Sequence, residues 1–235
     1  MTPRSKRGVL HHSAWEYGRS EQNNSLKLYG PRTGPVDILL IAAIHGDETE
    51  TTVVLSEALR CTPPGGIRNP VILSTNPDGA LQGTRCNARG VDLNRNWPTT
   101  NWSTDPVYYK NHGATVQDVL LSAGKTAGSE AETRALLGCV HRLQPRTIIS
   151  LHAPLGCIDD PQSTPLANWI ASQVGLPLVP NVGYATPGSF GTWSAEQNID
   201  IITWELPSEP LADIMASHTP TLFELITGDY RSRTL

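Results

Sequence analysis

The apolar run from Val36 to Ile44 constrains the fold of this chain more than any other segment. It reads VDILLIAAI, with Asp37 as its one charged residue. Because apolar and polar residues do not alternate here, the run predicts a strand that is buried on both faces, as strands of parallel sheets are. The segment from Glu50 to Arg60 has the pattern of a helix, and Pro63-Pro64-Gly65-Gly66 would end it. A buried strand followed at once by a helix indicates an α/β fold.

The rest of the chain continues this alternation. The segments 147–151 and 199–204 predict buried strands, and 71–74 predicts a shorter one. Asn76-Pro77-Asp78-Gly79 predicts a turn, and the polar residues 83–98 predict an ordered loop. Predicted helices run from a capping box at Ser129–Glu132 to about Leu143, over 165–174 and within 211–227. We therefore expect one α/β domain over residues 1–235, with a central twisted mixed sheet flanked by helices. Residues 1–34 are predicted to be an irregular N-terminal segment.

The composition argues against several classes of partner. A formal net charge of −4 gives no support to a nucleic-acid or anionic-membrane partner. No apolar run approaches the ~18 residues of a membrane span, and no secretion signal is recognisable. The four cysteines, which form no C-x-x-C pair, predict reduced thiols and a cytoplasmic protein: Cys61, Cys86, Cys139 and Cys157. None of them has a recognisable catalytic context. The oligomeric state stays open, with a homodimer among the alternatives.

Polar side chains follow three of the predicted strands. His45 and Glu48 come after the first strand, His152 ends the strand over 147–151, and Glu205 ends the strand over 199–204. Ligands of open α/β sheets bind outside the carboxyl ends of the strands, so these groups are expected to converge on one crevice. Two histidines and one carboxylate are a usual ligand set for a hydrolytic zinc ion, which keeps a fourth position for water. Gly46 would let the backbone bend between His45 and Glu48.

The spacing alone does not establish a metal site. An H-x-x-E sequence often occurs by chance, and a lone histidine at a strand end is more often a hydrogen-bonded structural residue. The remaining histidines have no partner at ligand spacing and are expected to be surface or structural residues: His11, His12, His112, His141 and His218. Without further context, Arg85, Arg89 and Arg95 would be interpreted as solvated loop charges.

Four sequence features taken together extend this interpretation. HGDE follows a buried strand, GTRCNARGVDLNRNWP lies downstream, His152 ends a later strand, and Glu205 lies in ITWELP. In these features the chain resembles the zinc carboxypeptidases of the carboxypeptidase A superfamily over about residues 36–206. The resemblance implies their three-layer fold and one zinc ion per chain, held by His45, Glu48 and His152.

The resemblance also implies roles for residues around the metal. Glu205 matches the family's general base, and Arg85 matches the arginine that polarises the scissile carbonyl and stabilises the oxyanion. Asn94 and Arg95 match the pair that binds the carboxylate of the substrate, for which a guanidinium is well suited. Tyr184 matches the mobile tyrosine that closes over the substrate, although a packing aromatic is the alternative at this position.

Three segments narrow the resemblance within the superfamily: residues 76–79, LHAPLGCIDDP and VGYATPGSFGTW. They resemble the bacterial amidases that cleave γ-D-glutamyl–meso-diaminopimelate bonds in murein peptides, which implies a small murein peptide as substrate and a role in peptidoglycan recycling. One member of the acidic pair Asp159/Asp160 would then bind an ammonium group of diaminopimelate, and a surface pair is an equal alternative. Ala153 departs from the family, which often has a polar residue after the third ligand, and so leaves contacts there in doubt.

Three other functions stay open at this point. A carboxypeptidase for α-linked peptides would share each of these catalytic residues. An aspartoacylase-type deacylase would use similar zinc ligands, although GVDLNRNWP argues against it. A binding protein without catalytic activity would not need the ligands and the base together.

Overall fold

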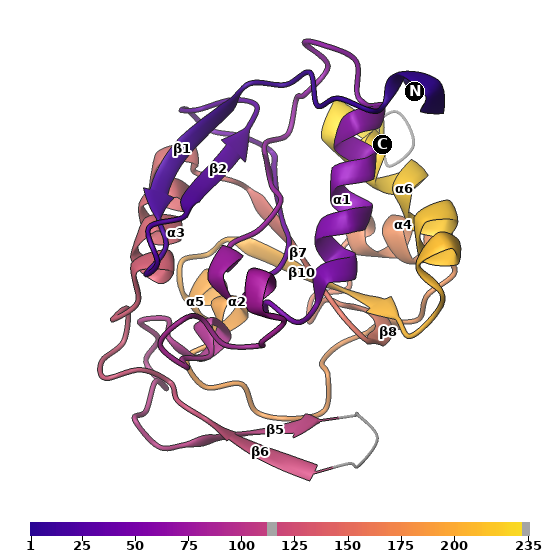
Figure 1. Ribbon diagram of the computed structural model, residues 1–235. Coiled ribbons are helices and arrows are strands. Elements are labelled where there is room, and N and C mark those ends of the chain that lie inside the picture. The colour runs from indigo at the N-terminus through magenta and orange to yellow at the C-terminus, as the bar shows by residue number, and fades with distance from the viewer. Residues whose placement is uncertain (112–116, 232–235) are drawn as a thin grey trace.

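A computed structural model describes residues 1–111 and 117–231 of the chain (Figure 1). Its main sheet has eight strands in the order β1-β2-β4-β3-β7-β10-β8-β9, and β5 and β6 form a separate hairpin. The strands are β1 (Ala14–Arg19), β2 (Ser25–Tyr29), β3 (Ile38–Ile41), β4 (Val71–Ile72), β5 (Val107–Asn111), β6 (Gln117–Leu121), β7 (Thr147–His152), β8 (Leu155–Asp159), β9 (Leu178–Val179) and β10 (Asp200–Pro207). The helices are α1 (Thr49–Cys61), α2 (Pro77–Gln82), α3 (Ala131–Leu143), α4 (Pro165–Val174), α5 (Phe190–Glu196) and α6 (Leu211–Thr227).

The sheet lies between two layers of helices, as its alternating side chains require. Leu40 of β3 belongs to an apolar cluster that includes residues of α1, α4 and α6. Leu39 and Ile41, on the opposite face, belong to a second cluster with residues of α3 and α5. Figure 1 shows α1, α4 and α6 together on one side of the molecule and α3 on the other. The predicted mixed sheet flanked by helices is therefore confirmed.

Most predicted elements occur where the sequence placed them. The helices α1, α3, α4 and α6 and the strand β7 match the expected ranges to within about two residues at each end, the usual uncertainty of such boundaries. The strand β10 continues three residues beyond its expected end at Trp204, to Pro207. The first strand is shorter than its apolar run, because β3 ends at Ile41. Ala43 has a φ of +50°, which turns the chain out of the sheet before His45.

The prediction of an irregular segment over residues 1–34 was wrong in part. Residues 14–29 form the antiparallel pair β1–β2, and β2 extends the sheet by pairing with β4. Leu26 and Leu28 are fully buried and Lys27 between them is exposed, which is the alternation of a half-buried strand. The pattern was present in the sequence, but it is only five residues long and stands among polar residues.

Two local predictions also need correction. Residues 76–79 are not a simple turn, because Asn76 caps helix α2 by accepting a hydrogen bond from the Gly79 amide. The expected capping box does not form, since Ser129 Oγ donates to Glu130 instead. The carboxylate of Glu132 accepts hydrogen bonds from the Glu21 amide and from Asn87. The hairpin β5–β6, the strands β8 and β9 and the helix α5 were not predicted.

The sheet topology brings the ends of three strands together. Strands β3, β7 and β10 are adjacent and parallel, so their carboxyl ends lie at one edge. In this register Glu205 pairs with His152, and β8 returns antiparallel so that Cys157 pairs with Glu205 on its other side. Within the described residues, no helix has the length and apolar character that crossing a membrane requires.

Candidate metal centre and active site

The turn after β3 places two side chains at the edge of the sheet. Glu48 stands at the N-terminal boundary of α1, but its carboxylate does not cap the helix. Thr51 fixes the turn instead: its hydroxyl donates to the Glu48 carbonyl at 2.6 Å and accepts from the Ala43 amide at 3.2 Å. The carboxylate of Glu48 is therefore free to face the histidines.

Gly46 is needed for a close backbone contact. A Cβ atom here would lie 2.2 Å from the Gly79 carbonyl carbon and 2.5 Å from the Thr84 carbonyl oxygen. The Gly46 amide also donates to the Arg85 carbonyl at 3.1 Å. The absence of a side chain at Gly46 thus joins the His45–Glu48 turn to the segment that carries Arg85.

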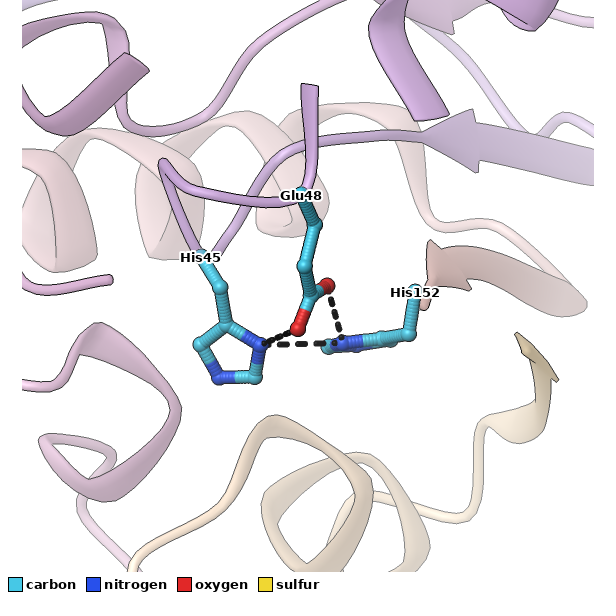
Figure 2. A group of neighbouring side chains, drawn as sticks. All are labelled: His45, Glu48 and His152. Carbon is cyan, nitrogen blue, oxygen red and sulfur yellow. Dashed lines mark hydrogen bonds and ion pairs between the residues drawn. The ribbon is translucent and has the colours of Figure 1, made fainter. Parts of the chain in front are cut away.

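His45, Glu48 and His152 point toward one another, as Figure 2 shows. His45 Nδ1 lies 2.7 Å from Glu48 Oε1, His152 Nδ1 lies 3.2 Å from Glu48 Oε2, and the two Nδ1 atoms are 3.2 Å apart. All three side chains are buried, and in the part of the chain that the structure describes they form the one group able to share a metal ion. Burial alone would raise the pKa of Glu48, but the two imidazole rings hold that pKa well below its usual range.

The three side chains fit a zinc ion. In a tetrahedral site with bonds of about 2.0–2.1 Å, neighbouring ligand atoms lie about 3.3 Å apart. The separations of 2.7 to 3.2 Å are slightly shorter, so a small outward adjustment would make room for the ion. Glu48 Oε2 is buried and faces His152 Nδ1 at 3.2 Å, so both carboxylate oxygens point toward the imidazole nitrogens. Two imidazoles and one carboxylate are also a frequent ligand set of catalytic zinc.

Two residues that the sequence interpretation missed support these ligands. The Asp92 carboxylate is buried, with one oxygen 3.4 Å from His45 Nε2 and the other accepting from Arg85 Nε at 3.1 Å. Ser150 Oγ lies 3.1 Å from His152 Nε2. Such partners orient the imidazole of a metal ligand. Asp92 was detectable as the acidic residue of GVDLNRNWP, and Ser150 as the polar residue in an apolar strand two positions before His152.

Arg85 lies beside the candidate metal ligands. Its Nη1 atom is 3.6 Å from Glu48 Oε1, and Asp92 holds the other side of the guanidinium. Burial alone would lower the pKa of Arg85, but Asp92 and Glu48 raise it above its ordinary value, so the side chain stays charged. A fixed positive charge is thus available next to the metal position.

Glu205 lies beside the ligands on β10 and is mostly buried. Burial raises the pKa of Glu205, and the nearby His152 opposes this shift. The Leu155 amide donates to Glu205 Oε2 at 3.5 Å. The carboxylate therefore stands in the register position next to His152 but is not one of the three clustered ligands.

The loop over residues 83–98 places Arg95 and Asn94 near the same edge. Arg95 is buried, its Nη1 donates to the Asn94 carbonyl at 2.7 Å, and its Nε has no hydrogen-bond partner among the described residues. Asn94 Oδ1 accepts from the Phe190 amide, so its carbonyl oxygen holds the start of α5. Tyr184 is largely exposed. Partial burial and Glu205 raise the pKa of Tyr184, and Arg95 acts in the opposite direction.

The two members of the acidic pair have different surroundings. Asp160 is buried, and its carboxylate accepts from the Gln162 amide and from both the amide and the hydroxyl of Thr164. Asp159 is half-buried, and its Oδ1 has no hydrogen-bond partner in the described part of the chain. Ala153, the non-polar residue after His152, belongs to the apolar cluster that includes residues of α1, α4 and α6, which explains how it is accommodated.

The other histidines and the cysteines do not join the site. His218 Nδ1 accepts from the Trp204 indole, His12 contacts the Thr62 carbonyl, His141 packs against Trp193, and His11 is exposed. His112 lies outside the described residues. All four cysteines are free and buried. Burial raises the pKa of each thiol, that of Cys157 to about 11 with Glu205 adding to the effect, which disfavours a thiolate nucleophile.

Comparisons with known proteins agree with this site. Residues 68–156 match the family model described as zinc carboxypeptidase. Murein peptide amidase A of Escherichia coli strain K12 is 45% identical over 207 residues, which cover 87% of this chain and 86% of that protein. The crystal structure of the murein-tripeptide amidase MpaA from E. coli O157 has a TM-score of 0.91 and 40% identity, and 96% of each chain is covered.

A more distant structure shares the fold alone. Carboxypeptidase A from Helicoverpa armigera has a TM-score of 0.65 at 17% identity, and the similarity covers 95% of this chain and 68% of that one. The similarity to the amidases extends over most of the chain, at 40–45% identity. This protein therefore belongs to the murein peptide amidase A family of zinc carboxypeptidases.

Proposed function

We propose that this protein hydrolyses the amide bond between γ-D-glutamate and meso-diaminopimelate in murein tripeptide and releases L-Ala-D-Glu and diaminopimelate. The two E. coli proteins described above are named for murein peptide or murein-tripeptide amidase activity. One observation of the structure carries the chemical part: the Glu205 carboxylate lies in register with His152 but apart from the ligand cluster. This arrangement provides a metal position and a separate base on one edge of the sheet.

The residues at this edge have complementary roles in the proposed reaction. Zinc, when bound by His45, Glu48 and His152, supplies a Lewis acid that polarises a carbonyl and makes water more acidic. Glu205 takes a proton from the attacking water as the carbon–oxygen bond forms. It then gives the proton to the diaminopimelate nitrogen as the carbon–nitrogen bond breaks. Arg85 stabilises the negative charge that develops on the carbonyl oxygen.

The substrate carboxylate next to the scissile bond is assigned to Arg95 and Asn94. Arg95 is buried, and its Nε has no hydrogen-bond partner among the described residues, so a carboxylate ligand would satisfy this donor. The side-chain oxygen Oδ1 of Asn94 already accepts a hydrogen bond from the Phe190 amide, so Asn94 would bind the substrate through its side-chain NH2 group. Tyr184, at the exposed rim, is assigned to close over the bound peptide.

The cellular setting forms part of the same proposal. Four free thiols are in keeping with a reducing compartment, so we place the enzyme in the cytoplasm, where it would act in peptidoglycan recycling. We also propose that residues 1–235 act as a single catalytic domain. All the named side chains come from one chain, so the proposal holds for a monomer and for a homodimer alike.

A substrate panel tests the proposal. Zinc-loaded protein is incubated with L-Ala-γ-D-Glu-meso-diaminopimelate, with the isomer in which the glutamate is linked through its α-carboxylate, and with an N-acetyl amino acid. Free diaminopimelate and the remaining peptide are quantified by mass spectrometry. We expect release from the γ-linked peptide and at most slow release from the α-linked isomer. Preferred cleavage of the α-linked peptide would instead indicate an ordinary carboxypeptidase, and preferred cleavage of the acetyl amino acid would indicate a deacylase.

A further inference from the structure

Asp159 shares a face of the sheet with the catalytic groups. It pairs with Thr203 of β10, and Thr203 pairs with Ser150 of β7, so these three form one row across the sheet. His152 and Glu205 occupy the next row, two residues further along their strands. Because side chains two residues apart point to the same face, both rows face the same side.

The opposite face of these strands confirms the orientation. The intervening row consists of Leu151, Trp204 and Ile158, which all belong to the apolar cluster with α4 and α6. Asp159 is therefore directed away from that cluster and toward the side that carries the metal ligands. Thr203 and Asp159 are both only half-buried, so solvent reaches this row.

One oxygen of the Asp159 carboxylate has no hydrogen bond from a described group. This oxygen is Oδ1, and it is buried. Burial and the adjacent Asp160 raise the pKa of Asp159, and His152 acts in the opposite direction. The Asp160 carboxylate, in contrast, already accepts hydrogen bonds from the Gln162 amide and from the amide and hydroxyl of Thr164.

We infer that Asp159, and not Asp160, binds the distal ammonium group of the diaminopimelate residue. This inference rests on the proposed function. Diaminopimelate in the tripeptide carries a second amino-acid centre, with an ammonium and a carboxylate, at the far end of its side chain. A half-buried carboxylate whose Oδ1 has no partner in the described part of the chain is a suitable partner for this ammonium, because a charge-assisted hydrogen bond satisfies both groups.

The dimensions of the sheet agree with this assignment. Asp159 is the diagonal neighbour of Glu205 across the β8–β10 pair, a relation with a Cα separation of about 7–8 Å. The two centres of diaminopimelate are four carbon–carbon bonds of about 1.5 Å apart, which span about 5 Å when extended. The substrate side chain is thus long enough to run from the metal edge toward the row of Asp159.

The test compares two substrates that differ by one amino group. The first is L-Ala-γ-D-Glu-meso-diaminopimelate, and the second has L-2-aminopimelate in place of diaminopimelate, which removes the distal ammonium only. Wild-type protein should favour the first in kcat/KM by roughly 10- to 100-fold, the range for a hydrogen bond between charged groups. Asp159→Asn should reduce this ratio to near one and should cleave the aminopimelate peptide about as fast as wild type does.

Asp160→Asn is the matched control. It should lower the thermal midpoint, because Asp160 organises the turn before α4, and should keep the wild-type ratio. A wild-type ratio near one, or an unchanged ratio in Asp159→Asn, would overturn the inference. If Asp159→Asn does not fold, Asp159→Ser is measured in its place against the same criteria.

Calorimetry separates this inference from the proposed function. Binding of free diaminopimelate and of free 2-aminopimelate to the zinc-loaded protein is measured without any turnover. A preference for diaminopimelate that disappears in the Asp159 variant supports the inference even if no tripeptide is cleaved, which would refute the proposed function alone. Equal binding of the two amino acids by wild-type protein would refute the inference even if the tripeptide is cleaved.

Discussion

Acidification should destabilise this protein through His218, a buried residue of α6 behind the active-site strand. The Trp204 indole nitrogen, which is only a donor, donates to His218 Nδ1 at 3.2 Å. Protonation of Nδ1 would therefore replace this hydrogen bond with two opposed donors. Burial lowers the pKa of His218 from 6.5 to about 4.

The sign and size of the effect follow from linkage. The folded-state pKa lies below the unfolded value, so the unfolded chain takes up the proton first as the pH falls. The stabilisation is complete above pH 6.5 and is lost progressively as the pH falls through about 4. With these two values, the loss attributable to His218 is about 2 kcal/mol at pH 5 and about 3 kcal/mol at pH 4.

Urea unfolding followed by tryptophan fluorescence measures this loss in metal-free wild-type protein and in His218→Asn. Asparagine can keep an acceptor near the position of Nδ1, but it does not titrate. The variant should be less stable at pH 7 and should lose about 2 kcal/mol less than wild type between pH 7 and pH 5. The other ionisable groups are the same in the two proteins, so their contributions cancel in the difference. Parallel stability curves for the two proteins would refute the reasoning.

Three further substitutions test individual parts of the site. Ala43→Gly should change the free energy of unfolding by less than about 1 kcal/mol, because glycine tolerates the positive φ of this residue but is more flexible in the unfolded chain. Ala43→Val should destabilise the protein by more than about 1 kcal/mol, because a larger side chain is strained at this φ. Equal urea midpoints for the two variants would contradict this. Asp92→Asn should weaken zinc binding by about 10- to 100-fold in a chelator competition, because it removes the carboxylate beside His45, and unchanged affinity would argue against that support. Arg95→Lys should raise KM for the tripeptide much more than it lowers kcat, since a lysine cannot replace the guanidinium fork, and an unaltered KM would remove Arg95 from carboxylate binding.

The sequence predicted those parts of the fold that have long and regular patterns. The run before His45 identified a buried central strand, and the helical patterns of α1, α4 and α6 placed those helices closely. The strand β2 escaped prediction because its alternation around Leu26 and Leu28 spans only five residues. The capping box failed because Asn87 and the Glu21 amide, both distant in sequence, engage Glu132. Such tertiary competition is not visible in a local pattern.

The candidate site was predicted more completely than the loops around it. His45, Glu48, His152 and Glu205 were singled out because each follows or ends a buried strand, and the resemblance to zinc carboxypeptidases implied their roles. The structure places them at one edge. The different environments of Asp159 and Asp160 depend on the pairing of β8 with β10, which short apolar segments do not reveal. Their roles, and those of Arg85, Asn94, Arg95 and Tyr184, stay predictions for the experiments above.

The most direct test of the account is the comparison of wild-type protein with Glu205→Gln after zinc loading. Zinc per chain is determined by mass spectrometry of the metal, and turnover is determined from the release of diaminopimelate from the tripeptide. Glu205 is outside the ligand cluster and is proposed to act as the base. Both proteins should therefore hold one zinc ion per chain, and the variant should lose about 10²- to 10⁴-fold in kcat. A variant that retains substantial turnover, or that loses its zinc, would contradict the account.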